Sequence, residues 1–239
     1  MLKDLFSFNY GSEYAIGFTQ LNFWILFLFA MIGLAIWGKK PLMKTIFFTA
    51  IGLFFYFKTS GVSVVILLFS MGINYFSARW IHSATSVKYR QITLIFAVAL
   101  NLLVLAYFKY AFFFTESFNA MFQTDFKALN YFAQWSSGFT GKGSLADQIL
   151  VPAGVSFFTF QSISYVVDVH RKDIKPVHNF FEYSFFITFF PHILMGPIAR
   201  AKDFIPQIRQ PHTLSQNEFS EALVMILRGF IKKLVLADY

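Results

Sequence analysis

The residues from Leu21 to Gly38 form an uncharged apolar run of 18 residues, LNFWILFLFAMIGLAIWG. At about 1.5 Å per helical residue this run reaches roughly 27 Å, close to the hydrocarbon thickness of a bilayer. In lipid, the backbone N–H and C=O groups must be satisfied within the segment, which an α-helix achieves. The run therefore predicts a membrane helix, and any function has to be sought in a protein that lies within a bilayer.

The composition of the chain agrees with this interpretation. Hydrophobic residues make up 56% of the 239 residues and charged residues 13%, and 35 residues are Phe. The absence of cysteine excludes disulfides, a thiolate nucleophile and cysteine-ligated metals. The net charge of +8 is divided among segments between apolar runs, which is typical of loops beside membrane spans, so no nucleic-acid partner is expected.

Basic residues between the apolar runs predict a topology by the positive-inside rule. They place the N-terminus and residues 58–61 and 115–148 outside, and residues 39–44, 79–90 and 171–175 inside. The first twenty residues lack the pattern of a cleavable signal peptide, so the run at 21–38 is expected to target the protein to the membrane itself. The number of apolar runs predicts a multi-pass protein. The apolar runs are 21–38, 42–57, 62–78, 91–114, 149–169, 180–198 and 222–236.

The run at 180–198 does not fit simple alternation, because basic residues flank both of its ends. Pro191 and the pair Gly196-Pro197 also interrupt it. These features favour a re-entrant segment over residues 180–205. Non-helical backbone at membrane depth survives only where protein buries it or where it lines a wet cavity, so this segment is expected to line a cavity on the cytoplasmic side.

The fifth apolar run contains the largest number of polar residues. Gln161, Ser164, Tyr165 and Asp168 recur at spacings of three and four, which places them on one face of a helix. Such a face must point at other helices or at a water-filled path, and either interhelical hydrogen bonds or a substrate path would explain it. An ion pair with Arg171, three residues further on, is a separate explanation for Asp168.

Two further features have both an ordinary and a chemical interpretation. Arg228, Lys232 and Lys233 share one helix face, where they would reach lipid headgroups or form an anion site for a phosphorylated donor. His192 lies in the middle of the 180–198 run and could act as a general base, but no carboxylate within the local helical turns would orient it. No metal, nucleotide or nucleophile-elbow motif is present.

Three ordered stretches of the sequence resemble the membrane-bound O-acyltransferases. They are VPAGVSFFTFQSISYVVDVHR at 151–171, FFEYSFFITFFPHILMGPIARAKDFIPQI at 180–208 and RGFIKKLVLAD at 228–238. The branch that they resemble is that of the bacterial alginate O-acetylation protein and related cell-wall polysaccharide acetyltransferases. The resemblance implies an all-α, polytopic bundle around a tunnel, in the bacterial inner membrane.

The same resemblance implies a reaction. An acetyl group would move from a cytoplasmic thioester, acetyl-CoA or another acyl donor, toward hydroxyls of an alginate-like exopolysaccharide or of peptidoglycan. No bound cofactor is expected, and the implied partners are the lipid bilayer, the polysaccharide acceptor and an extracytoplasmic acetyltransferase. The family's catalytic histidine lies downstream of the RGFIKKLVLAD-like stretch, and no position here matches its motif. We therefore expect residues 1–239 to be the N-terminal portion of one larger membrane domain, inactive by itself and without a catalytic residue.

We expect the remaining site residues to form walls and donor contacts. Gln161, Ser164, Tyr165 and Asp168 would line the tunnel. Gly196, Pro197 and Arg200 would shape its cytoplasmic mouth, and Arg200, Lys232 and Lys233 would lie near donor phosphates.

Three alternatives remain open at this point. The first is transfer of D-alanine from a carrier protein toward teichoic acids. The second is a transporter or flippase for lipid-linked sugars, which the polar face and the broken helix would also suit, although the two halves of the chain show no convincing self-similarity. The third is a scaffold subunit without chemistry.

Overall fold

A computed structural model describes residues 17, 20–126, 151–194, 196–210 and 215–237. All regular elements in these ranges are helices, so the predicted all-α class is confirmed for the described part of the chain. The chain divides into two compact units, Met1–Arg209 and Gln210–Tyr239, and each is described by itself.

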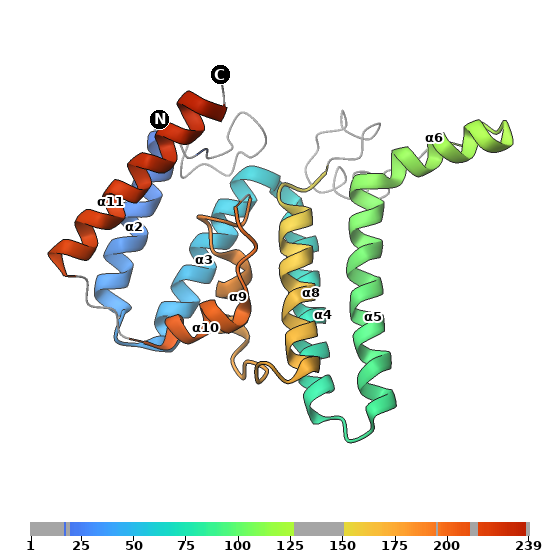
Figure 1. Cartoon of the computed structure of the whole chain (residues 1–239), viewed down its shortest axis with the longest axis horizontal. Helices are drawn as coiled ribbons and strands as arrows, with labels where there is room; N and C mark the ends of the chain where they lie inside the picture. The colour runs from blue at the N-terminus through green and yellow to red at the C-terminus, as the bar shows by residue number, and fades with distance from the viewer. Residues whose placement is uncertain (1–16, 18–19, 127–150, 195, 211–214, 238–239) are drawn as a thin grey trace. The chain divides into compact units, whose positions relative to one another are not determined.

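In the first unit, the described residues from 20 onward form four successive helices joined by tight connections (Figure 1). Pro41 at the start of α3 supplies a preset φ where no backbone donor is needed. Gly61, with φ of 54°, begins the 3₁₀ turn of residues 61–63 at which the chain reverses into α4. The helices are α2 (Leu21–Trp37), α3 (Pro41–Ser60), α4 (Val64–Ser83) and α5 (Val87–Leu105).

Beyond α5, helical structure continues further than the sequence predicts. A π-helix, η2 (Ala106–Tyr110), leads into α6 (Ala111–Phe122), so residues 115–122 of the segment expected as a polar loop are helical. The reason is local: Phe118 and Phe122, one turn apart, place their ring centroids 4.5 Å from each other. The turn-prone residues 136–144 lie outside the described residues.

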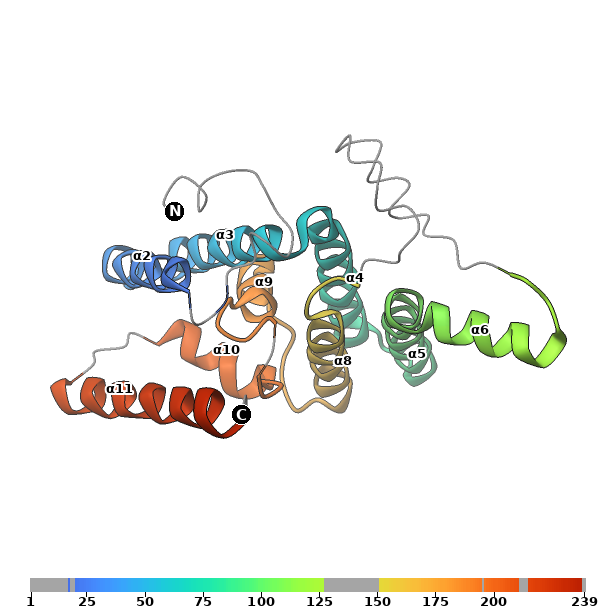
Figure 2. The same cartoon turned by 90° about the horizontal axis from the view of Figure 1, so that it is seen from above.

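The helix α8 (Val155–Arg171) packs against both α4 and α5, and α9 (Phe180–Thr188) packs against α3 (Figures 1 and 2). The third helix of this part, α10 (Ala201–Arg209), contacts α8 and α9. Aromatic residues dominate the core that these helices share. Fully buried examples are Tyr56, Phe158, Tyr165, Tyr183 and Phe186.

The interruption predicted near Pro191 is confirmed. With 9 residues α9 spans only about 14 Å, too short to cross a bilayer. The described residues 189–194 and 196–200 that follow it are non-helical. The first part of this break is packed into the protein: Phe190 is buried, with its ring centroid 5.6 Å from that of Phe23. Gly154, with φ of 70°, lets the backbone of Ile193 approach so closely that a Cβ would lie 2.3 Å from its carbonyl oxygen. Re-entry of this segment into a membrane stays a prediction.

Two described helical stretches, Pro41–Ser83 and Val87–Phe122, are long and apolar enough to cross a membrane by length and composition. In the second, only 22% of the most apolar window is buried within the protein. Most of this apolar window is therefore not covered by the described protein. Exposed apolar surface of this kind is typical of a face that contacts lipid or another protein. The exposed large side chains on α5 include Ile92, Ile95, Phe96, Leu102 and Leu103.

The second unit contains α11 (Gln216–Ile231) and a terminal π-helix, η4 (Lys232–Ala237). A capping box begins α11: the Glu218 amide donates to Ser215 Oγ at 3.3 Å, and the Ser215 amide donates to Glu218 Oε2 at 2.8 Å. The run at 222–236 is therefore not α-helical throughout, because it changes to π-helix at Lys232.

Candidate functional site

The polar face predicted on the fifth apolar run lies on α8, and two of its residues hold neighbouring backbone. The Gln161 side chain is buried, and its Nε2 donates to the Phe186 carbonyl of α9 at 3.1 Å. The Tyr165 hydroxyl is buried and accepts a hydrogen bond from the Val177 amide at 3.0 Å. These two side chains therefore bind α8 to the chain that follows it.

Asp168, on the same face, has a different environment. Its side chain is 4% exposed, and its Oδ2 has no hydrogen-bond partner among the described residues. Within this part of the chain no ion pair joins Asp168 to Arg171, so that prediction is wrong: Asp168 is buried in the bundle while Arg171 is exposed. An unpaired buried carboxylate oxygen is unfavourable unless a ligand, ion or water meets it. Ser164, about one helical turn before Asp168, is half-buried.

An aromatic cluster extends from Tyr165 onto two other helices. The ring centroids of Tyr165 and Tyr183 are 4.7 Å apart, and those of Tyr183 and Tyr75 are 6.1 Å apart. The Tyr183 hydroxyl donates to Ser162 Oγ at 3.3 Å. Sequence reasoning missed Tyr75 and Tyr183, because they come from α4 and α9 and no spacing along the chain relates them to α8. Their only sequence signal is a hydroxyl within an apolar run. Such a hydroxyl needs a hydrogen-bond partner, but the sequence does not identify which residue provides it.

The residues predicted at the cytoplasmic mouth are exposed. Gly196, with φ of 141°, and Pro197 lie in the non-helical segment before α10. The Arg200 carbonyl accepts from the Asp203 amide at 3.1 Å and so begins α10, while its residue remains exposed. Lys232 and Lys233 are exposed on η4, in the other unit.

An ion pair joins α9 to α10 on either side of the non-helical segment. Arg209, at the end of α10, places Nη2 2.7 Å from Oε2 of Glu182, in the first turn of α9. This hydrogen bond raises the pKa of the Arg209 guanidinium above its ordinary value. The pair brings together the two ends of the 180–209 stretch.

His192 lies against aromatic rings instead of acidic groups. Its ring centroid is 4.9 Å from that of Phe189 and 5.7 Å from that of Phe204. Among the described residues, no group of three or more His, Asp or Glu side chains is arranged to hold a metal ion.

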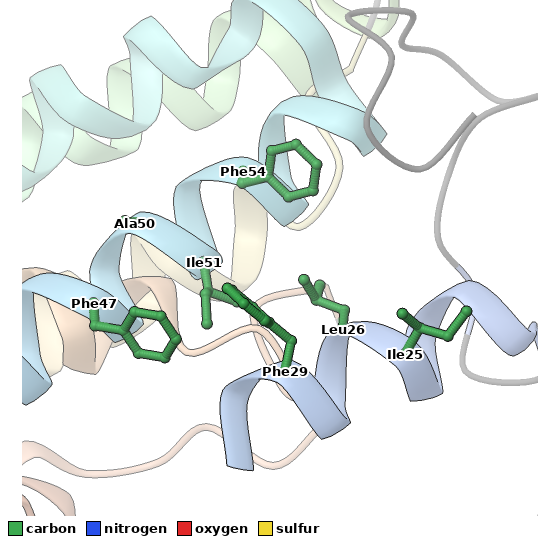
Figure 3. A pocket seen from close by; sticks show the side chains of 7 residues that line it. All are labelled: Ile25, Leu26, Phe29, Phe47, Ala50, Ile51 and Phe54. Atoms are coloured by element: carbon green, nitrogen blue, oxygen red, sulfur yellow. The ribbon is translucent and has the colours of Figure 1, made fainter. Parts of the chain in front are cut away.

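An open pocket of about 320 Å³ lies between α2 and α3 (Figure 3). Ile25, Leu26 and Phe29 line it from α2, and Phe47, Ala50, Ile51 and Phe54 line it from α3. All seven side chains are apolar, so this pocket offers no group for acid–base chemistry or for binding charge. It suits hydrocarbon, such as a lipid acyl chain.

Comparisons with known proteins confirm the resemblance over part of the chain. The chain is 35% identical to the probable alginate O-acetylase AlgI of Pseudomonas aeruginosa over 178 residues, which cover 72% of this chain and 31% of that protein. It is 36% identical to the probable alginate O-acetylase AlgI of Azotobacter vinelandii over 142 residues, 59% of this chain and 25% of that protein. It is 26% identical to the peptidoglycan O-acetyltransferase of Helicobacter pylori over 247 residues, 89% of this chain and 44% of that protein.

Part of the chain is thus similar to proteins named probable alginate O-acetylase and peptidoglycan O-acetyltransferase, which is the branch that its three ordered stretches resemble. It spans about a quarter to under half of the length of these curated relatives. No family model matches the chain. No solved structure matches it either.

Proposed function

We propose that the full-length protein is a membrane O-acetyltransferase that passes an acetyl group from a cytoplasmic thioester toward hydroxyls of an extracytoplasmic polysaccharide. The observation that carries the proposal is the similarity to proteins named alginate O-acetylase and peptidoglycan O-acetyltransferase. An alginate-like exopolysaccharide and peptidoglycan are accordingly the acceptors to test first.

A membrane location is supported by the surface of the first unit. The stretch Val87–Phe122 is long enough to span and leaves most of its apolar window unburied. The loops at the ends of α4 and α8 are rich in Lys and Arg, which favours the cytoplasmic side for them. This orientation would place the thioester donor at the Arg79–Arg90 end of the bundle and the N-terminus outside, in a multi-pass inner-membrane protein.

The reaction is an ordinary acyl transfer. A hydroxyl oxygen attacks the thioester carbonyl, its proton passes to a general base, the C–S bond breaks, and an ester and a free thiol are formed. Polarised donors stabilise the oxyanion that forms at the carbonyl. In this proposal the described residues bind and guide the donor. The general base is not one of these residues and belongs to another part of the full-length protein.

Within that scheme the α8 face has two kinds of residue. Gln161 and Tyr165 fix the wall, because their polar atoms are bonded to backbone of the following segment. Asp168 has an unpartnered buried oxygen and Ser164 is half-buried, so these two are the candidates for contact with a substrate. Gly196, Pro197 and Arg200 would shape the cytoplasmic mouth, with Lys232 and Lys233 near the donor phosphates.

The proposal is tested by deleting the gene and restoring it at full length. Restored O-acetyl ester in the exopolysaccharide or peptidoglycan, with label arriving from [14C]acetyl-CoA in membranes, is the expected result. If the restored gene instead produces D-alanine esters, and their formation depends on a carrier protein loaded with D-alanine, the result would favour D-alanine transfer toward teichoic acids over acetyl transfer. Movement of a lipid-linked sugar without any ester formed would favour the transporter, and ester formation that persists without the gene would leave a scaffold role.

The assignment of the donor contacts needs its own variant. Arg200→Ala combined with Lys233→Ala in the full-length protein removes two of the proposed phosphate contacts. We expect a rise of at least about tenfold in the apparent KM for the donor, since charge-assisted contacts are worth roughly 1.5–3 kcal/mol each. An unchanged KM would remove these residues from the donor site.

A further inference from the structure

A second pocket, of about 340 Å³, lies at the end of α4. One wall is formed by residues 76–83 of α4, and the other by residues 176–178, which connect α8 to α9. Arg79, His82 and His178 bring nitrogen donors to this pocket, and Phe76 and Trp80 bring aromatic surface. No carboxylate is among its described lining residues. The pocket is therefore distinct in chemistry from the apolar one between α2 and α3.

Arg79 is held in place at the wall of this pocket. Its Nη1 donates to the Tyr75 hydroxyl at 2.9 Å and to the His178 carbonyl at 3.2 Å. The guanidinium carbon also lies 5.6 Å from the centroid of the Tyr75 ring. Among the described residues, hydrogen-bond partners are found for Nη1 of this guanidinium but not for Nε or Nη2. These two nitrogens are therefore available to bind a ligand. A guanidinium fixed in this way loses little freedom when it binds an anion.

Tyr75 supports the same arrangement but is not one of the residues that line the pocket. Its hydroxyl donates to the His178 carbonyl, and its ring packs 5.3 Å from that of Phe180 at the start of α9. The connection between α8 and α9 is thereby tied to α4 through backbone atoms. The imidazole of His178 is not needed for this tie, which leaves it exposed at the pocket.

The charge around the pocket has one predominant sign. Arg90 Nη2 donates to the His170 carbonyl at 2.9 Å, which brings the start of α5 to the end of α8. These neighbouring stretches carry the exposed cations Lys88, Arg171, Lys172 and Lys175, against one exposed carboxylate, Asp173. The nearby Glu182 carboxylate is engaged by Arg209. An excess of positive charge on these neighbouring stretches attracts anions to this end of the helices.

We propose that this pocket binds a phosphate group, with Arg79, His82 and His178 as its donors and Trp80 and Phe76 as a platform for the attached group. Arg is well suited to phosphate because its planar fork can make two parallel hydrogen bonds. The phosphate can belong to a soluble nucleotide, as in a CoA thioester, or to the headgroup of an anionic phospholipid. As a site for a CoA thioester this inference rests on the proposed function, but phosphate binding is measured without turnover and is therefore tested separately.

The test compares two probes on the full-length protein in nanodiscs. The first probe is radiolabelled adenosine 3′,5′-bisphosphate, measured by equilibrium binding. The second is phosphatidylglycerol, measured as the lipid retained by the purified protein from membranes of equal phosphatidylglycerol and phosphatidylcholine content. The variants are Arg79→Gln, and His82→Gln with His178→Gln, which keeps the His178 carbonyl that anchors Arg79. Lys109→Gln, on η2 beyond the far end of α5, removes a comparable charge as the matched control.

We expect one probe to bind the unaltered protein and both pocket variants to weaken it by at least about tenfold, with Lys109→Gln unchanged. Weakening confined to the nucleotide identifies a soluble ligand, and weakening confined to phosphatidylglycerol identifies a lipid headgroup. The proposal is overturned if neither probe binds, or if both variants bind as the unaltered protein does. Phosphate binding in a protein that transfers no acetyl would overturn the proposed function alone.

Discussion

Asn74 and Asn101 hydrogen-bond to each other through both side-chain amide groups, across the contact between α4 and α5. Asn101 Nδ2 donates to Asn74 Oδ1 at 2.8 Å, and Asn74 Nδ2 donates to Asn101 Oδ1 at 3.1 Å. Ser70 Oγ adds a third contact, to Asn101 Oδ1 at 3.2 Å. All three side chains are buried, so this network is a buried polar link between the two helices.

Replacing Asn101 with Ala leaves the buried Oδ1 of Asn74 without its donor, although Asn74 Nδ2 still donates to the Ser70 carbonyl at 2.7 Å. We expect the free energy of unfolding in detergent to fall by about 1–3 kcal/mol, which is the penalty for an unsatisfied buried polar group. A double-mutant cycle with Asn74→Ala should give a coupling of about 1 kcal/mol. Thr93→Ala, which removes a hydroxyl bonded only within α5, is the control. Additive losses in the cycle would contradict the link.

At Gly52 the backbone of α3 closely approaches the end of α9. A Cβ at this position would lie 2.0 Å from the Thr188 carbonyl oxygen, so a methyl group collides with backbone that cannot rotate away. We expect Gly52→Ala to destabilise the protein by about 1–3 kcal/mol through overpacking. Thermal unfolding of the purified protein measures this loss.

Gly72 in α4 provides the matched control for that substitution. A Cβ there meets nothing within 4 Å, so Gly72→Ala should stabilise α4 by about 0.5–1 kcal/mol through helix propensity alone. Equal effects of the two substitutions would show that the α3–α9 approach is looser than described.

Much of the helical framework was predictable because hydropathy and helix breakers act locally. An uncharged run such as residues 21–38 specifies a helix by length, and Pro191 with Gly196-Pro197 specifies an interruption. The extension of helix to Phe122 was not predicted, because polar residues at 115–119 masked the aromatic contact one turn further on.

The site was predictable as residue types and one helix face, but its partners were not. The sequence predicts that Gln161 and Tyr165 need hydrogen bonds, yet the partners are the backbone of Phe186 and Val177, which have no side-chain signature. From the sequence, Arg79 is interpreted only as a basic loop residue that favours the cytoplasmic side. Its contact with His178 could not be predicted, because it depends on how α4 packs beside the α8–α9 connection.

The ion pair between Glu182 and Arg209 is expected to contribute little to stability. The Arg209 side chain is 55% exposed, so water and salt screen the pair, and Arg209→Gln should reduce the free energy of unfolding by at most about 1 kcal/mol. Because the hydrogen bond with Glu182 raises the pKa of Arg209, the contribution of its charge to stability is fully present below the ordinary pKa of arginine and is lost only as the pH rises through the raised pKa. Its contribution should therefore be flat between about pH 5 and pH 9.

Salt provides the measurement for this pair. The loss caused by Arg209→Gln should shrink when thermal unfolding is repeated in about 1 M NaCl, where the screening length is about 3 Å. Lys202→Gln, an exposed charge on the same helix, is the control and should show no such change. A loss well above 1 kcal/mol that persists in salt would show that the pair fixes the whole 180–209 stretch.

Asp168 separates a structural role of the α8 face from a functional one. Asp168→Asn keeps the shape of a side chain whose Oδ2 lacks a partner among the described residues, and removes its charge. Removing a buried unpaired charge should leave the melting temperature unchanged or raise it. If the carboxylate meets a substrate, kcat/KM for acetyl transfer by the full-length protein should fall at least about tenfold, as expected for one charge-assisted contact. Phe160→Leu, on the exposed side of the same helix, should leave transfer unchanged. Unaltered transfer by Asp168→Asn, with a higher melting temperature, would assign Asp168 no part in the reaction.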